Sequence, residues 1–337
     1  MESFDRIQAA LRGRHVDRPP VFPHIGDHAG IINKLSYKMM YQNAEKAADA
    51  HIKALDLYGY DVTTIQVEPS WPVAEACGAE VKYLPDKNPW IIKHLLNSEN
   101  DLVKLKVPDF MSTESSRVMI EGTRILTNET NVPVAAYMTG PITFSLQLMP
   151  YTILIKKMYK NPEFAHSLIQ KSVLIIKEYI KALKDVGATI LVLCEHDIQL
   201  LKPEHVKQFS LKYLKDIFKI YDYNILHMCG DVTSHLNLFA EELKNINKLN
   251  TLNIGPLVDI SKTQDLLEHK IGVAGNIDHN NLLPFGNPKK IEIAVENAIK
   301  ASGGDSRFIV APGCEITADT PIENVKALVN AVKTYNG

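Results

Sequence analysis

Residues 223–230 read Tyr-Asn-Ile-Leu-His-Met-Cys-Gly, a short β-like run that ends in a histidine, a cysteine and a glycine. Far downstream, residues 310–314 read Val-Ala-Pro-Gly-Cys, again an apolar run with glycine and cysteine at its end. Because the side chains of a strand alternate between its two faces, His227 and Cys229 project on the same side. If the two runs are neighbouring strands of a parallel sheet, Cys314 reaches the same end of that sheet.

The three side chains His227, Cys229 and Cys314 are the ligand types that zinc prefers. Three protein ligands leave one tetrahedral position open, which is typical of a catalytic zinc rather than a structural one. Each residue taken alone is as readily a packed core residue, because free cysteine is among the most buried residue types. The prediction of a zinc site therefore depends on the three residues converging.

The same rhythm of a β-rich run, a polar or glycine-rich turn and a helical segment extends in both directions from this stretch. The predicted strands are residues 20–25, 62–67, 132–138, 188–194, 223–228, 248–254, 271–275 and 307–311. The predicted helices are residues 44–57, 116–127, 161–186, 203–221, 232–246, 261–267, 288–302 and 321–335.

Eight strands alternating with helices predict an α/β fold, a (β/α)₈ TIM barrel in one domain over residues 1–337. An open doubly wound sheet is the alternative architecture. A helix is expected before the first strand, since Phe4, Ile7 and Leu11 recur at helical spacing before Gly13. Residues 83–109 and 146–158 are long for βα connections, and we expect them to form extra loops over the barrel mouth.

The composition is that of a soluble globular protein, with 45% hydrophobic and 23% charged residues. A formal net charge of -2 gives no reason to expect nucleic-acid binding. The longest apolar runs, such as residues 188–194, are too short to cross a bilayer. With four cysteines and no basic-then-apolar leader, a cytoplasmic location with reduced thiols is expected.

In a barrel of this kind, chemistry lies in the loops after the strands, so polar residues there are candidates. Glu195 is the candidate catalytic residue, either as a fourth metal ligand or as the acid that handles the leaving-group proton. A plain structural ion pair is an equal alternative for it. The candidates for binding the substrate or cofactor are Asp27, His28, Glu68, Trp71, Asn276 and Asp278.

These residues resemble the uroporphyrinogen decarboxylase superfamily, and most closely its zinc-containing branch of corrinoid methyltransferases. That branch includes methylcobamide:coenzyme M, chloromethane-type and O-demethylase-type enzymes. The resemblance covers most of the chain, and its specific motifs are His-x-Cys-Gly and Pro-Gly-Cys-Glu. The motifs that carry it are Arg18-Pro19-Pro20-Val21, Thr139-Gly140-Pro141-Ile142-Thr143, Leu201-Lys202-Pro203-Glu204, His227-x-Cys229-Gly230, Gly275-Asn276-Ile277-Asp278 and Ala311-Pro312-Gly313-Cys314-Glu315.

The resemblance implies that His227, Cys229 and Cys314 bind zinc. It also implies a methyl transfer between a corrinoid (cobalamin) and a small substrate, either a thiol such as coenzyme M as acceptor or a methoxylated aromatic or methyl compound as donor. The chain lacks an Asp-x-His-x-x-Gly motif, so the corrinoid is expected on a separate partner protein. The chain departs from the coenzyme M enzymes at Asn253, where they carry an acidic residue, and at Glu195, where Asp is usual.

Two other functions remain open. The first is a decarboxylase of the parent type, although residues 23–30 lack the arginines that would pair with porphyrin carboxylates. The second is a non-catalytic barrel that binds a tetrapyrrole or a corrinoid protein.

Overall fold

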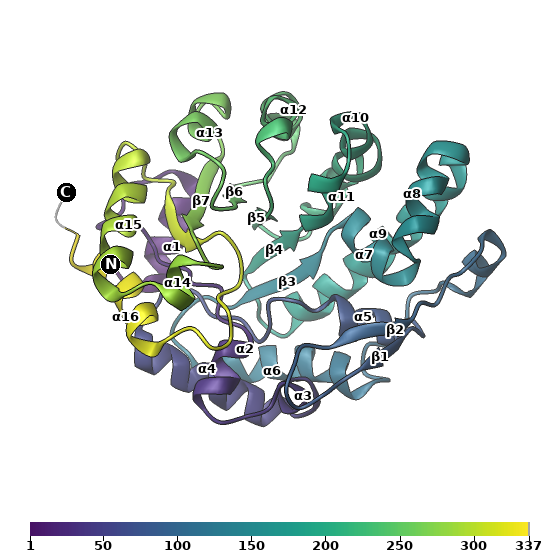
Figure 1. Ribbon diagram of the computed structural model, residues 1–337, viewed down its shortest axis with the longest axis horizontal. Coiled ribbons are helices and arrows are strands. Elements are labelled where there is room, and N and C mark those ends of the chain that lie inside the picture. The colour runs from purple at the N-terminus through teal and green to yellow at the C-terminus, as the bar shows by residue number, and fades with distance from the viewer. Residues whose placement is uncertain (336–337) are drawn as a thin grey trace.

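The computed structural model describes residues 1–335, and the last two residues of the predicted 1–337 domain lie outside them. Six parallel strands pair in chain order: β3 (Ala135–Thr139), β4 (Ile190–Cys194), β5 (Tyr223–Met228), β6 (Thr251–Ile254), β7 (Gly272–Ile277) and β8 (Ile309–Pro312). Figure 1 shows the helices arranged around this sheet. The division of the chain into a single domain stays a prediction.

Two further segments close the sheet into a barrel. Val21 pairs with Val310 of β8 and Thr63 with Val134 beside β3, each through one isolated parallel bridge. The Asp61 amide donates to Val21 O at 2.9 Å, which joins the two segments to each other. The predicted (β/α)₈ barrel is therefore confirmed, and the open doubly wound sheet is not what forms.

The prediction of regular strands at residues 20–25 and 62–67 was wrong, because each segment forms only one isolated β-bridge. A ladder of strand hydrogen bonds needs backbone N–H groups, and proline has none. The first segment contains Pro20 and Pro23, and the strand next to the second segment is preceded by Pro133.

A buried ion cluster lies where these two segments meet. The Asp61 carboxylate accepts from Arg6 Nη1 at 2.9 Å, from Arg18 Nη1 at 2.8 Å and from the Val21 amide at 2.8 Å.

The helices that cover the barrel are mostly those expected. They are α4 (Ala44–Tyr58), α6 (Glu114–Glu129), α9 (Pro162–Asp185), α10 (Pro203–Val206), α11 (Lys212–Ile217), α12 (Leu236–Glu242), α13 (Ile260–Leu266), α15 (Pro288–Ala301) and α16 (Ile322–Lys333). The predicted helix 203–221 is interrupted by a π-helical turn at Lys207–Leu211. In the predicted helix 232–246, short 3₁₀ turns flank α12. Even the 24-residue α9 is not apolar enough to span a membrane, and no other helix within residues 1–335 is either.

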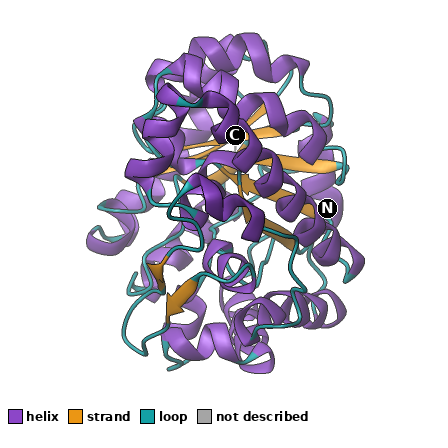
Figure 2. Ribbon diagram, turned by 90° about the vertical axis from the view of Figure 1, so that its right-hand side faces the viewer, coloured by secondary structure: helices purple, strands orange, loops and turns teal. Residues whose placement is uncertain are grey.

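Short elements that sequence patterning did not predict are inserted between the strands. They are α2 (Asp27–Ile32), α3 (Tyr37–Gln42), α5 (Ser70–Ala76), α7 (Pro141–Leu148), α8 (Tyr151–Lys160), α14 (Leu282–Phe285) and an antiparallel hairpin of β1 (Glu80–Lys82) and β2 (Trp90–Lys93). Of this hairpin, β2 lies in the expected extra stretch 83–109, whereas β1 precedes it. Figure 2 shows its strands lying apart from the central strands, and Figure 1 shows it projecting beside α8.

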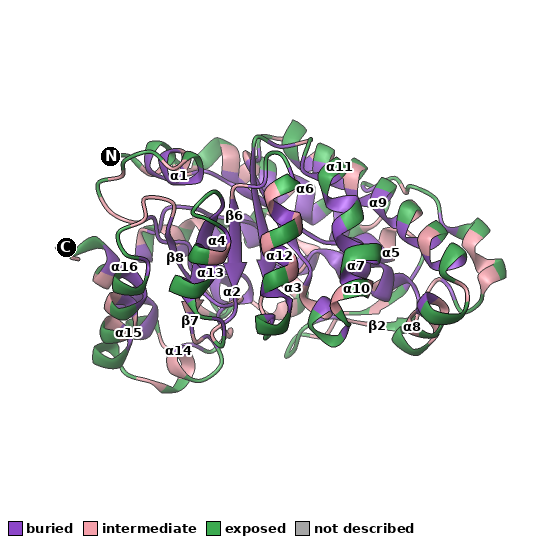
Figure 3. Ribbon diagram, turned by 90° about the horizontal axis from the view of Figure 1, so that it is seen from above, coloured by how far each residue is buried: buried purple, intermediate pink, exposed green. Residues whose placement is uncertain are grey.

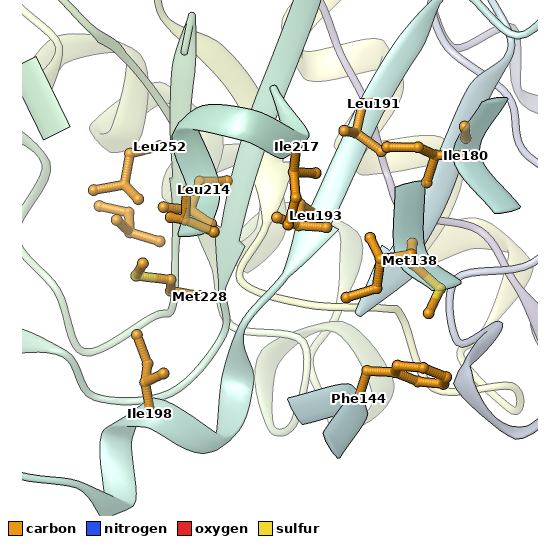
Figure 4. Close-up of a cluster of buried hydrophobic side chains, with 14 of the residues drawn as sticks. Met138, Phe144, Ile180, Leu191, Leu193, Ile198, Leu214, Ile217, Met228 and Leu252 are labelled. Atoms are coloured by element: carbon orange, nitrogen blue, oxygen red, sulfur yellow. The ribbon is translucent and has the colours of Figure 1, made fainter. Parts of the chain in front are cut away.

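Alternation along the strands sorts the core into two layers. In β4, Ile190, Val192 and Cys194 point into the barrel, whereas Leu191 and Leu193 point toward the helices. Figure 4 shows the outer layer, in which strand residues such as Leu193 and Met228 pack against helix residues such as Leu214. Figure 3 shows the same sorting at the scale of the molecule, with exposed residues on the outer sides of the helices.

The helix α1 (Ser3–Arg12) seals the amino end of the barrel. Its Ile7, Ala10 and Leu11 belong to the interior cluster, and Asn250 Nδ2 donates to Leu11 O at 3.0 Å. The helix ends at Gly13, whose left-handed φ of 65° suits glycine and lets its amide bond back to Ala10 O. Since one end is plugged, access to the interior comes from the carboxyl ends of the strands.

Candidate metal centre

The barrel brings His227, Cys229 and Cys314 together at the carboxyl ends of its strands. Each offers one ligand atom, and these atoms all lie within 4.8 Å of one another. His227 follows Tyr223 and Ile225 on the inward face of β5, and Cys229 comes directly after that strand. Cys314 comes two residues after β8. The alternation argument thus places the imidazole and the thiol on one side, as expected from the sequence.

Two glycines allow the loops around this cluster to approach closely. A Cβ added to Gly255 would lie 2.3 Å from the carbonyl oxygen of Cys229, and one added to Gly313 would lie 2.5 Å from Cδ of Pro256. Both distances are too short for a side chain. The loops after β5, β6 and β8 can therefore meet only because these positions carry no Cβ.

Asn253 fixes the orientation of the His227 ring. The two residues are direct partners across β5 and β6, and Nδ1 of His227 donates to Oδ1 of Asn253. The other amide atom, Asn253 Nδ2, donates to Ala274 O at 3.1 Å, which determines which end of the amide faces the ring. The proton therefore sits on Nδ1, and Nε2 keeps its lone pair for a metal ion.

The two thiols act on each other. The hydrogen bond from the Cys314 thiol, helped by His227, lowers the pKa of Cys229 to about 3, whereas the same contact raises the pKa of Cys314 well above its ordinary value. The contact thus favours a thiolate at Cys229 that accepts the proton of the Cys314 thiol. A cation that replaces this proton would turn both sulfurs into thiolate ligands.

The donor set fits zinc. Bonds of about 2.0–2.3 Å in tetrahedral geometry separate ligand atoms by roughly 3.3–3.8 Å, so the side chains need to close by at most about 1.5 Å. One imidazole and two sulfurs are borderline and soft ligands, which favour zinc over magnesium or calcium. The same set leaves a coordination position for a further group.

His24 and Tyr137 lie next to the cluster and were not singled out from the sequence. His24 is 1% exposed, its Nδ1 is hydrogen-bonded to the Tyr137 hydroxyl, and its ring centroid lies 5.4 Å from that of His227. Burial, and then the neighbouring His227, lower the pKa of His24 well below its ordinary value. The only sequence signal was the place of His24 at the end of the first barrel segment.

Glu195 has partners different from those predicted. Its side chain is 0% exposed and accepts hydrogen bonds from the amides of Ile142 at 3.1 Å and Thr143 at 3.0 Å, and from Ser210 Oγ at 2.6 Å. It is therefore an acceptor for the first turn of α7, and Ser210 reaches it from the π-helical turn. Burial raises its pKa while these donors lower it. Glu195 is not among the residues whose ligand atoms meet in the cluster.

Asp27 and His28 face different surroundings although they are adjacent. Asp27 Oδ1 accepts from Gln66 Nε2 at 2.9 Å, its amide donates to Glu315 Oε1 at 2.9 Å, and burial raises its pKa to about 6. His28 Nδ1 donates to Ala318 O at 3.0 Å, and its Nε2 accepts from the Tyr58 hydroxyl at 2.8 Å. Both nitrogens of this buried ring are thus used within the fold, which leaves His28 no free atom for a substrate.

The remaining candidates divide between the mouth and a separate pocket. Glu68 and Trp71, both partly buried, lie at the mouth, where Glu68 Oε1 accepts from the Ser70 amide at 3.0 Å. Asn276 and Asp278 instead line a pocket of about 560 Å³ beside α13, α14 and α15, and none of the three cluster residues lines it. Asp278 caps the turn that follows β7 by accepting from the amide of Asn281 at 3.0 Å.

Glu315 belongs to the mouth as well, and sequence reasoning gave it no role. It follows Cys314 directly and accepts from the Asp27 amide. Burial raises its pKa well above the ordinary value, and the nearby Asp27 and Glu68 carboxylates add to this. Its position next to the second cysteine was the available signal.

The family model for uroporphyrinogen decarboxylase (URO-D) matches residues 2–335. The chain belongs to this family. Similar curated proteins include uroporphyrinogen decarboxylase of Francisella tularensis subsp. novicida, which is 25% identical over 97% of this chain and 98% of its own length. The enzyme of the same name from Protochlamydia amoebophila is also 25% identical, over 99% of this chain and 92% of its own.

Solved structures confirm the barrel fold of this URO-D family member. A methyltransferase from Methanosarcina mazei superposes with a TM-score of 0.88 at 22% identity, over 99% of this chain and 98% of that one. A B12-independent methionine synthase from Shewanella matches with a TM-score of 0.59 at 13% identity, over 86% of this chain and 88% of that one. At these identities the likeness concerns the fold.

Proposed function

We propose that this URO-D family protein is a zinc-dependent methyltransferase, which moves a methyl group between a corrinoid carried by a separate protein and a small substrate. The observation that carries the proposal is the convergence of His227, Cys229 and Cys314 at the open end of the barrel. The similarity of the fold to a Methanosarcina methyltransferase supports it.

Zinc held by these residues would supply Lewis acidity, which lowers the pKa of a bound thiol or stabilises the charge that develops on a departing oxygen. The side chains of the protein prepare the site for this. Asn253 holds the His227 tautomer with Nε2 available. Two thiolates and a neutral imidazole balance a divalent charge, so a substrate thiolate bound there stays electron-rich.

Decarboxylation of a porphyrin is the second candidate, since the curated relatives carry that name. It would require cations for several substrate carboxylates. The segment after the first barrel strand, residues 23–30, contains His24, Asp27 and His28 but no arginine, and Asp27 adds negative charge at the mouth. This argues against a polyanionic substrate and in favour of methyl transfer.

The corrinoid protein would dock at the carboxyl rim. Leu200, Leu257 and Phe285 follow β4, β6 and β7 and are 59%, 75% and 81% exposed. Large apolar side chains grouped on one rim favour a protein contact. Gly140, Pro141 and Met149, which follow β3, are buried and do not contribute to this surface. The variant Leu257→Asp should slow transfer with the corrinoid protein and not with free cobalamin; equal slowing with both would contradict docking there.

The test of the proposed function is metal content together with methyl transfer. We expect about one zinc per chain in the reduced protein and almost none in Cys229→Ala. Cys77→Ala is the matched control, because Cys77 is a free cysteine outside the cluster. Methyl transfer is followed in the corrinoid spectrum, with methylcobalamin or its Co(I) form and a panel of thiols and methoxylated aromatics. Equal zinc in both variants, or no zinc in the wild-type protein, would refute the proposal.

A further inference from the structure

The segments that form the barrel mouth around the candidate metal centre carry no lysine or arginine next to the strand ends. Each of the eight segments that follow the barrel strands begins with a stretch that lacks Lys and Arg. These stretches are residues 23–33, 68–79, 140–150, 195–201, 229–235, 255–261, 278–288 and 313–321. The same stretches carry acidic residues, among them Asp27, Glu68 and Glu315.

These three carboxylates gather beside the metal ligands. Glu315 follows Cys314 and accepts from the Asp27 amide, while Asp27 holds Gln66. Glu68 comes two residues after Gln66, at the end of the same barrel segment. Within residues 1–335, none of the three forms an ion pair with a lysine or arginine, although ion pairs are common elsewhere on the surface. The cluster therefore has no permanent countercharge, and the titratable group that faces it is His196, whose pKa Glu68 helps to raise against the effect of burial.

A buried amide oxygen points into the same space. Gln66 is 1% exposed, and because its Nε2 donates to Asp27, its Oε1 must face the other way. This Oε1 has no hydrogen-bond partner among the described residues. A Cβ placed on Gly26 would lie 2.0 Å from Glu315 Oε1 and 3.2 Å from Gln66 Oε1, so both oxygens face one point. Both atoms are acceptors, and leaving the buried Gln66 Oε1 unpaired is costly.

From this arrangement we infer that the small substrate carries a cationic, nitrogen-based head group, bound by Asp27, Glu68 and Glu315 beside the metal centre. The inference rests on the proposed methyl transfer and narrows its substrate. An ammonium group supplies the missing positive charge, and a protonated amine also supplies donors for Gln66 and the carboxylates. A sulfonate or carboxylate at this place would find like charges and no partner. An anionic thiol of the coenzyme M type is therefore disfavoured.

The experiment compares three thiols that differ only in the group two carbons from sulfur. These are 2-mercaptoethanesulfonate, 2-mercaptoethanol and 2-mercaptoethyl-trimethylammonium. The protein is loaded with Co²⁺ in place of zinc, and binding is read from the cobalt–thiolate absorption, which does not require methyl transfer. Each affinity is calculated from the concentration of the deprotonated thiol, because the cationic group lowers the pKa of the thiol in the same molecule.

We expect the ammonium thiol to bind about 10-fold or more tighter than the sulfonate, with the neutral thiol between them. Glu68→Gln and Asp27→Asn should each reduce this ratio by about 3-fold or more. Glu129→Gln, on the exposed end of α6, is the control that should leave it unchanged. Equal or tighter binding of the sulfonate, or a ratio that neither mouth variant changes, would overturn the inference. Failure of the protein to give any cobalt–thiolate spectrum would instead overturn the proposed metal site together with it.

Discussion

Replacing Glu195 with Gln separates a structural role of this residue from a role as metal ligand. The carboxylate is fully buried and accepts hydrogen bonds from the amides of Ile142 and Thr143 and from Ser210 Oγ. Glutamine keeps the shape and one acceptor oxygen. Its NH₂ group must then face at least one of these donors, which leaves a buried N–H or O–H without an acceptor.

The magnitude follows from the lost contacts. An unpaired buried donor costs about 1–3 kcal/mol. The loss of the charge adds nothing to this cost, because burial raises the pKa of Glu195 and so disfavours its ionised form. For a chain of 337 residues the entropy of unfolding is about 0.7 kcal/mol per degree, so the Tm should fall by about 1–4 °C.

The assay is differential scanning calorimetry at one scan rate, with zinc measured on the same samples. We expect Glu195→Gln to melt earlier with its zinc content unchanged, and the exposed Glu129→Gln to match the wild-type protein. If Glu195→Gln melts at the wild-type temperature and loses its zinc, the carboxylate is a metal ligand and our reasoning on the helix is wrong.

Two further outcomes follow from buried charge. Burial lowers the pKa of His28 to about 4 from about 6.5, so its contribution to stability is complete above pH 6.5. Protonation of the unfolded chain removes about 3 kcal/mol between pH 6.5 and 4; urea unfolding across this range should show the loss, and His28→Gln should reduce it. Asp61→Asn leaves the buried Arg6 and the half-buried Arg18 underpaired and should cost about 3–5 kcal/mol, a decrease in Tm of about 4–7 °C. An unchanged Tm in that variant would show that the seam does not depend on the ion cluster.

The periodicity of the sequence was enough to predict those parts of the candidate site that lie on regular strands. His227 and Cys229 are two residues apart at the end of a strand, so their common side followed from alternation alone. The barrel was predictable from the same kind of pattern, because β3 to β8 overlap six of the predicted apolar runs.

Residues whose role depends on tertiary neighbours could not be assigned in this way. Glu195 follows β4 as expected, yet the amides that it accepts from belong to α7, which lacks a long helical pattern. Asn276 and Asp278 also follow a strand, but their side chains bind the backbone around a pocket outside the barrel. Spacing along the chain does not determine which loops lie opposite one another.

The barrel strands differ in how extensively they pair with their neighbours, and this difference separates the candidate metal ligands from the acidic residues at the mouth. The sulfurs and the imidazole extend from β5 and β8, which belong to the continuous ladder, whereas Asp27 and Glu68 follow the two segments that touch their neighbours through one bridge each. Because these two segments have fewer interstrand hydrogen bonds, the backbone at Asp27 and Glu68 is easier to displace than the backbone that carries the candidate metal ligands. A new substrate preference could therefore arise through changes in the weakly paired quarter of the barrel, without disturbing the tightly paired part that carries the candidate metal ligands.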